Sequence, residues 1–93
     1  MKAGNVNEFL ESITWQEDII LFKGKKYFFN PCGYPDRAVL DIQRLNLKNE
    51  WEEDFYHVEG ATTRECVTKM TAAPIWDGKT FWEVEPEMTW TEW

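Results

Sequence analysis

Few side chains in this sequence have the chemistry of a catalytic or metal site. The chain contains one histidine, His57, and two cysteines, Cys32 and Cys66, which are far apart in sequence. A zinc site needs about four ligands in paired spacing, so no metal site is predicted. A cysteine paired with His57 would also need an orienting residue and an oxyanion site, and no motif supplies them. We therefore expect a protein that is not an enzyme and that uses no cofactor.

Carboxylates are the chemically distinctive groups. The chain has 17 acidic and 10 basic residues and a formal net charge of −7. Residues 1–48 carry six acids against seven bases, whereas residues 49–93 carry eleven acids against three bases. The second half therefore holds the excess negative charge, which would repel a polyanion. We expect no direct nucleic-acid binding, although Lys23, Lys25 and Lys26 precede aromatic residues, because lysines at a hairpin tip also keep a sheet edge soluble.

The acids of the second half form two clusters in the sequence. The first is Glu50, Glu52, Glu53 and Asp54, and the second is Asp77, Glu83, Glu85 and Glu87. On a strand, alternate side chains project to one side about 6.6 Å apart, a spacing of the same order as that of successive phosphates in a nucleic-acid strand. Such a face could imitate a phosphate backbone. The alternative is a solvated face that keeps an aromatic-rich protein soluble.

Six tryptophans give the sequence a second candidate surface. Trp90 and Trp93 lie at the end of the chain and, together with Phe81 and Trp82, could form an exposed patch. Tryptophan is a favoured anchor at protein interfaces. The alternative is that these rings fold under the sheet and complete the core.

Hydrophobic spacing predicts the elements that position these residues. Apolar residues at helical spacing predict a helix over 5–13, and Lys23-Gly24-Lys25 predicts the turn of a hairpin over 18–30. Two prolines and a glycine predict a loop over 31–36. Residues 37–47 fit a strand or a helix, and their β-branched residues favour the strand. Residues 51–59 predict a fourth strand.

The last third begins with a clear helix start. Thr62 and Glu65 have the spacing of a capping box, so a helix should begin at Thr63 and end before Pro74. Asp77-Gly78 predicts a turn. After it, alternation of apolar and charged residues predicts an extended aromatic segment, with Phe81 out of phase.

These elements predict a single α+β domain over residues 1–93. We expect a four-stranded antiparallel β-meander with an N-terminal helix and a C-terminal helix followed by the extended segment. The sequence has no apolar run long enough to cross a membrane and no export signal. A cytoplasmic location and reduced cysteines are therefore expected.

The leading functional hypothesis is a non-catalytic binding or inhibitor protein that presents an acidic, aromatic surface to a basic protein partner. Small acidic proteins of this kind include nuclease inhibitors and proteins that phages or mobile elements use against nucleic-acid-handling defence proteins. The alternatives are a toxin-immunity protein, a small-molecule or peptide binder that uses an aromatic sheet face, and a homodimer that buries the C-terminal tryptophans.

Overall fold

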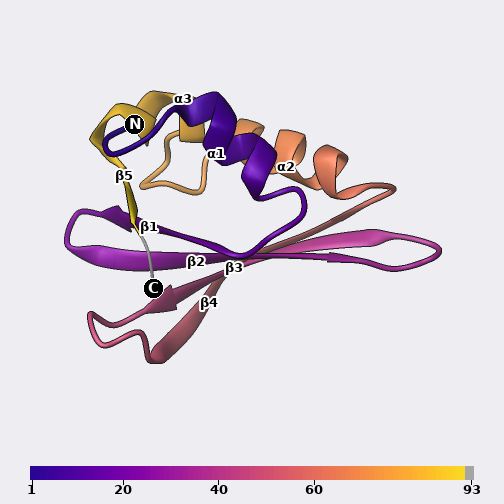
Figure 1. Ribbon diagram of the computed structural model, residues 1–93, viewed down its shortest axis with the longest axis horizontal. Coiled ribbons are helices and arrows are strands. Elements are labelled where there is room, and N and C mark those ends of the chain that lie inside the picture. The colour runs from indigo at the N-terminus through magenta and orange to yellow at the C-terminus, as the bar shows by residue number, and fades with distance from the viewer. Residues whose placement is uncertain (92–93) are drawn as a thin grey trace.

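The computed structural model describes residues 1–91, which form two layers (Figure 1). One layer is a five-stranded antiparallel sheet in the order β4-β3-β2-β1-β5, and the helices cover one of its faces. The strands are β1 (Asp18–Phe22), β2 (Lys25–Gly33), β3 (Ala38–Leu45), β4 (Trp51–Gly60) and β5 (Thr89–Thr91). The helices are α1 (Val6–Ser12), α2 (Thr63–Ala72), α3 (Phe81–Val84) and the 3-10 helix η1 (Glu85–Glu87). We call the helix-covered face of the sheet the inner face and the opposite face the outer face.

The meander of β1 to β4 confirms the prediction from the sequence. Lys23 and Gly24 have φ values of 51° and 74°, the left-handed pair that a tight hairpin turn requires. Ala38–Leu45 is a strand, paired on one side with β2 and on the other with β4. The strand interpretation of residues 37–47 is therefore correct.

The predicted loop over 31–36 is wrong at its start, because β2 continues to Gly33. Pro31 lies opposite Leu40 of β3. Proline has no backbone N–H and so cannot donate to a neighbouring strand. The pairing of β2 with β1 ends at Phe29, so no β1 residue lies beside Pro31 and no hydrogen bond is lost there. The turn itself lies between Gly33 and Ala38.

Both predicted helix starts are confirmed. The side-chain oxygen of Asn5 accepts hydrogen bonds from the backbone N–H groups of Asn7 and Glu8, at 2.8 and 3.1 Å. The hydroxyl of Thr62 accepts from the backbone N–H of Glu65 at 3.1 Å. These bonds satisfy donors that the first turn of a helix leaves without a partner.

The four-strand prediction fails in the last third, where the expected extended segment is a short helix, a 3-10 turn and a fifth strand. Phe81, Val84 and Met88 point into the core, whereas Trp82 is 50% exposed. This spacing of three and four residues is helical, and the carboxylate of Glu83 accepts from the backbone N–H of Thr80 at 3.0 Å. The alternation of apolar and charged residues after Gly78 therefore wrongly predicted an extended segment.

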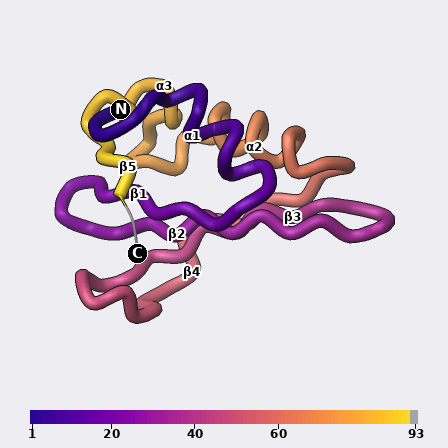
Figure 2. The backbone as a smooth tube through the Cα atoms, viewed as in Figure 1, coloured from indigo at the N-terminus to yellow at the C-terminus, as the bar shows by residue number. Residues whose placement is uncertain are grey.

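The two ends of the described chain lie side by side (Figure 2). The backbone N–H of Lys2 donates to the carbonyl of Met88 at 2.7 Å, and the N–H of Trp90 donates to the carbonyl of Lys2 at 2.9 Å. On its other side β5 pairs with β1, with Trp90 opposite Ile20. The last strand is thus held between the first residues and the first strand.

Aromatic rings fill the space between the sheet and the helices. Phe9 of α1 meets Phe29 of β2 edge to face, with ring centroids 5.2 Å apart. Trp76, in the loop between α2 and α3, is 1% exposed and lies against Phe29 and Phe81. Large rings thus fill the core of a thin domain that has few elements. Within residues 1–91, no helix is long and apolar enough to span a membrane.

Candidate functional site

The loop between β3 and β4 is shaped by Asn46. Its side-chain oxygen accepts from the backbone N–H groups of Lys48 and Glu50, at 2.8 and 3.0 Å. The backbone N–H of Asn46 donates to the carbonyl of Glu50 at 2.8 Å, and Asn49 adopts a left-handed φ of 64°. Asparagine tolerates this conformation and makes this kind of local bond. The loop therefore has a defined shape, and Leu47 at its tip is 66% exposed.

Two irregularities in the pairing of β3 with β4 decide where the β4 side chains point. Phe55 and Glu52 have no partner on β3, so each is an extra residue in β4. Phe55 contacts Tyr27 and Trp76 of the core. Trp51 lies opposite Leu45, on the outer face, and is 60% exposed.

Polar contacts fix the orientation of Trp51. Its indole N–H donates to a carboxylate oxygen of Asp54 at 3.3 Å. The side-chain amide of Gln43 donates to the same oxygen at 3.4 Å. Trp51 and Asp54 therefore share one face, because the extra residue Glu52 shifts the alternation of side chains between them.

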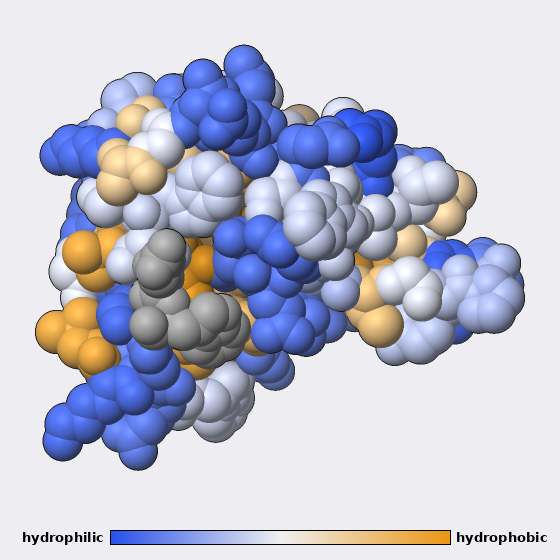
Figure 3. All heavy atoms as spheres, in the orientation of Figure 1, coloured by the Kyte–Doolittle hydropathy of each residue, from blue (hydrophilic) through white to orange (hydrophobic). Residues whose placement is uncertain are grey.

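Leu47 and Trp51, with the first predicted acidic cluster, form what we call the hairpin surface. Its residues are Leu47, Glu50, Trp51, Glu52, Glu53 and Asp54. The hairpin that carries it extends away from the helical layer (Figure 1). Figure 3 shows hydrophilic residues over most of the visible face and a group of hydrophobic side chains at its left end, where the tips of the β1–β2 and β3–β4 hairpins lie.

The charge of the hairpin surface is partly neutralised by the scaffold. A guanidinium nitrogen of Arg44 lies 3.0 Å from the carboxylate of Glu53, and another lies 3.9 Å from Glu52. Within residues 1–91, Glu50 and Asp54 form no ion pair, and both are exposed. The net negative charge here is therefore smaller than the sequence predicted.

The second predicted acidic cluster does not form, because its members lie on a turn and two short helices. Asp77 pairs with the ammonium group of Lys23 at 3.0 Å, and this contact lowers the pKa of Asp77. Glu83 accepts from the backbone and hydroxyl of Thr80, which lowers the pKa of Glu83. Glu85 pairs with the N-terminal ammonium at 2.6 Å, and Glu87 is exposed on η1. These acids therefore do not line one side of a strand, as the alternation predicted.

Trp90 is partly buried and packs against the core. Its ring meets Phe9 edge to face at 5.4 Å, and its indole N–H donates to Asp18 at 3.1 Å. Trp93, the other predicted interface residue, lies outside the described residues. Neither Leu47 nor Trp51 was predicted as a partner-binding residue, although an apolar residue between Asn46 and Lys48 in a polar loop was a signal for Leu47.

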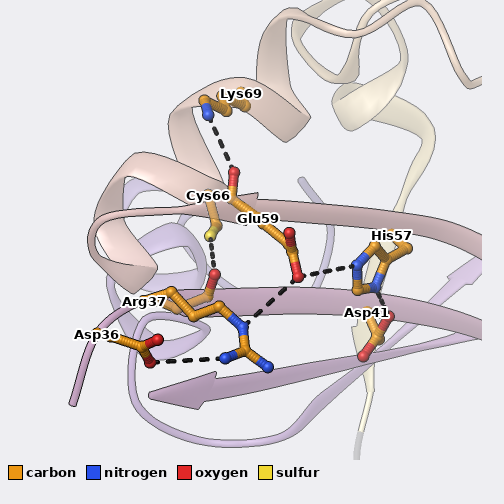
Figure 4. A network of polar contacts seen from close by, with 8 residues as sticks. Asp36, Arg37, Asp41, His57, Glu59, Cys66 and Lys69 are labelled. Atoms are coloured by element: carbon orange, nitrogen blue, oxygen red, sulfur yellow. Dashed lines mark hydrogen bonds and ion pairs between the residues drawn. The ribbon is translucent and has the colours of Figure 1, made fainter. Parts of the chain in front are cut away.

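A polar network crosses the outer face at the far end of β3 and β4 (Figure 4). His57 contacts Asp41 through Nδ1 at 2.5 Å and lies 3.9 Å from Glu59 through Nε2. Arg37 lies 3.6 Å from the same Glu59 oxygen. The contact with Asp41 raises the pKa of His57. His57 is exposed on the sheet surface.

Cys32 and Cys66 are free thiols. The thiol of Cys66 is buried and donates to the carbonyl of Ala38 at 3.5 Å, and burial raises its pKa, which disfavours a nucleophilic thiolate. No group of three or more potential metal ligands comes together within residues 1–91.

Comparisons with protein-family models, curated proteins and solved structures found no significant match to this chain.

Proposed function

We propose that this protein is a non-catalytic binding protein that docks a basic protein partner through the hairpin surface. The observation that carries the proposal is the exposure of Leu47 and Trp51, at 66% and 60%, on the same hairpin as Glu50 and Asp54. Most other large apolar side chains fill the core; Trp15, Tyr34 and Trp82 are also exposed but lie outside this hairpin. Exposed apolar groups with a charged surround are typical of protein interaction sites.

The apolar and acidic residues have different roles in this proposal. Leu47 and Trp51 supply the area that is buried in the complex, and tryptophan is among the commonest residues with a large share of binding energy. Glu50 and Asp54, which form no ion pair within the described residues, attract a basic partner and speed its approach. Arg44 neutralises part of the charge of Glu52 and Glu53. The apolar side chains of Leu47 and Trp51 therefore contribute more to affinity than the acidic residues do.

The partner docks on side chains rather than by adding a strand to the sheet. β4 is an edge strand, but its two extra residues interrupt the regular edge. At the other end of β4, the ammonium group of Lys69 donates to the carbonyl of Glu59 at 2.9 Å. Bulges and charged side chains are the usual features that protect an edge strand from strand addition.

The proposal extends to the kind of partner. A basic protein that handles nucleic acid fits an acidic docking surface, which makes an inhibitor of such a protein, encoded by a phage or mobile element, the favoured biological role. The support is the acidity of the second half of the chain and the exposed hairpin. An immunity protein that binds a basic toxin would use the same surface chemistry.

Binding kinetics of surface variants test the proposal. A partner is first captured with the intact protein and identified by cross-linking, and the rates are then measured with purified components. Trp51→Ala should increase the dissociation rate roughly tenfold or more. The double reversal Glu50→Lys and Asp54→Lys should slow association several-fold at low salt and much less at high salt.

Trp82→Ala is the matched control, because Trp82 is 50% exposed but lies on α3, on the helical side of the sheet. It should leave both rates unchanged. A captured partner that binds Trp51→Ala as tightly as the unmodified protein, or that is released by Trp82→Ala instead, would refute the hairpin surface as the docking site.

A further inference from the structure

A small cavity lies at one corner of the core, on the inner face of the sheet beside the base of the β3–β4 hairpin. It is formed where the β1–β2 hairpin meets β4 and the loop between α2 and α3, and its volume is about 140 Å³. Its lining residues are Phe22, Lys23, Lys25, Tyr27, Phe55, Ile75, Trp76 and Asp77. The cavity therefore combines aromatic walls with charged groups.

Three rings form a continuous aromatic wall. The ring centroids of Tyr27 and Phe55 are 4.9 Å apart, those of Phe55 and Trp76 are 4.9 Å apart, and those of Tyr27 and Trp76 are 5.1 Å apart. A protein cavity of about 150 Å³ accepts a benzene molecule. The volume at this corner therefore suits a group the size of one six-membered ring.

The wall also contains a hydrogen-bond donor without an acceptor. Trp76 is 1% exposed, and its indole N–H has no partner among the described residues. Buried donors are nearly always paired, so such a group calls for an explanation. Phe55, which covers part of this wall, is the extra residue in β4 and is less constrained by the sheet than its neighbours. The indole nitrogen itself is inaccessible to solvent in this structure, so a ligand reaches it only if Phe55 shifts.

The mouth of the cavity has an unbalanced positive charge. The ammonium group of Lys23 is paired with Asp77 at 3.0 Å. Lys25 is exposed and forms no ion pair within residues 1–91. Asp77 is the only acid among the lining residues, so the charged groups of the mouth sum to one positive charge.

Two tight turns hold this mouth in place. Lys23 and Gly24 have φ values of 51° and 74°, and Asp77 and Gly78 have values of 55° and 80°. Such paired left-handed residues define a narrow turn whose shape is fixed. The ion pair between Lys23 and Asp77 joins the two turns, so the mouth is positioned by local geometry as well as by packing.

We infer that this cavity binds a small aromatic carboxylate, with the ring against Tyr27 and Phe55 and the carboxylate between the indole N–H of Trp76 and the ammonium of Lys25. This arrangement gives the unpaired donor an acceptor and gives Lys25 a counter-charge. It also places the flat apolar ring where the walls are aromatic. The site shares no residue with the hairpin surface.

Titration with benzoate, followed through the indole N–H signals in two-dimensional NMR spectra, tests this inference. Benzoate should shift the Trp76 indole signal with a dissociation constant of about 1 mM, as expected for a ligand of this size. The indole signals of Trp51 and Trp82 should stay in place. Benzamide, which is neutral, and benzylamine, which is cationic, should bind at least several-fold more weakly than benzoate.

Variants separate the cavity from general surface effects. Lys25→Gln should weaken benzoate binding about fivefold, as expected for one partly exposed ion pair. Lys48→Gln, on an exposed lysine of the β3–β4 loop, should leave it unchanged. Ile75→Trp should abolish binding by filling the cavity.

The inference is overturned if the Trp76 signal does not move, if benzylamine binds as well as benzoate, or if Lys25→Gln and Lys48→Gln have equal effects. The double variant Leu47→Ser and Trp51→Ala should still bind benzoate. Failure of the docking proposal and failure of this one are therefore seen in separate experiments.

Discussion

The indole N–H of Trp90 donates to Oδ1 of Asp18 at 3.1 Å, which joins the last strand to the first. The other oxygen of Asp18 accepts from the hydroxyl of Ser12 at 2.7 Å, and that hydroxyl oxygen accepts from the side-chain amide of Gln16 at 2.6 Å. Asp18 is only 8% exposed. One buried carboxylate therefore connects α1, β1 and β5.

Removal of this carboxylate should destabilise the whole domain. Asp18→Ala leaves the N–H of Trp90 and the hydroxyl of Ser12 without their acceptor, and we expect a loss of about 2–4 kcal/mol in the free energy of unfolding. Urea denaturation followed by tryptophan fluorescence measures it. Glu17→Ala, at the exposed neighbouring position, should change the free energy by less than about 0.5 kcal/mol. Equal effects of the two substitutions would show that the Asp18 contacts contribute no stability.

Replacement of the buried Trp76 should lower the free energy of unfolding much more than replacement of the exposed Trp51. Trp76→Ala removes a ring that is 1% exposed and should cost about 3–5 kcal/mol. Trp51→Ala removes a ring from the surface and should cost no more than about 1 kcal/mol. Thermal unfolding of both variants checks this difference. A large loss for Trp51→Ala would mean that Trp51 supports the fold and is not free to serve a partner.

Substitution of the turn residue Gly24 should lower the stability of the fold only because of its backbone conformation. A side chain at Gly24 would meet no atom within 4 Å, but its φ is +74°. Gly24→Ala should therefore cost about 1 kcal/mol. Gly33→Ala is the matched control, because it is equally free of contacts and has no positive φ. It should be close to neutral in chemical denaturation, and a loss as large as that at Gly24 would exclude the backbone explanation.

The His57 network predicts a specific pH dependence. The pKa of His57 is raised above 6.5 mainly by the hydrogen bond to Asp41, with a smaller contribution from the charge of Glu59. Protonation of His57 therefore stabilises the fold fully below about pH 6.5, and this contribution disappears as the pH rises through the higher folded-state pKa.

An NMR titration of the imidazole signals, with chemical denaturation at the two ends of the range, measures this effect. Asp41→Asn should return the pKa of His57 toward 6.5 and flatten the dependence of stability on pH in this window. Glu53→Gln, which removes an acid paired with Arg44, should leave the pKa in place. An unchanged pKa in Asp41→Asn would contradict the assignment to Asp41.

Local chemistry determined much of the fold. The caps at Asn5 and Thr62 and the turns at Lys23-Gly24 and Asp77-Gly78 depend on bonds or dihedral angles within a few residues, so the sequence predicted them correctly. The β1–β4 meander followed because short turns force successive strands to pair. The location of Glu52, Glu53 and Asp54 on a strand also followed, because they come just after the third turn of the meander.

Tertiary contacts decided the remainder. Apolar residues from Trp76 to Trp90 fit alternation nearly as well as helical spacing, and packing of Phe81 against Phe9 and Trp76 selected the helix for Phe81–Val84. The pairing of β5 with β1 joins residues about 70 positions apart, which no local pattern specifies. Likewise, only the folded chain brings Lys23 to Asp77 and Arg44 to Glu53, because charge compensation depends on distance in space and not in sequence.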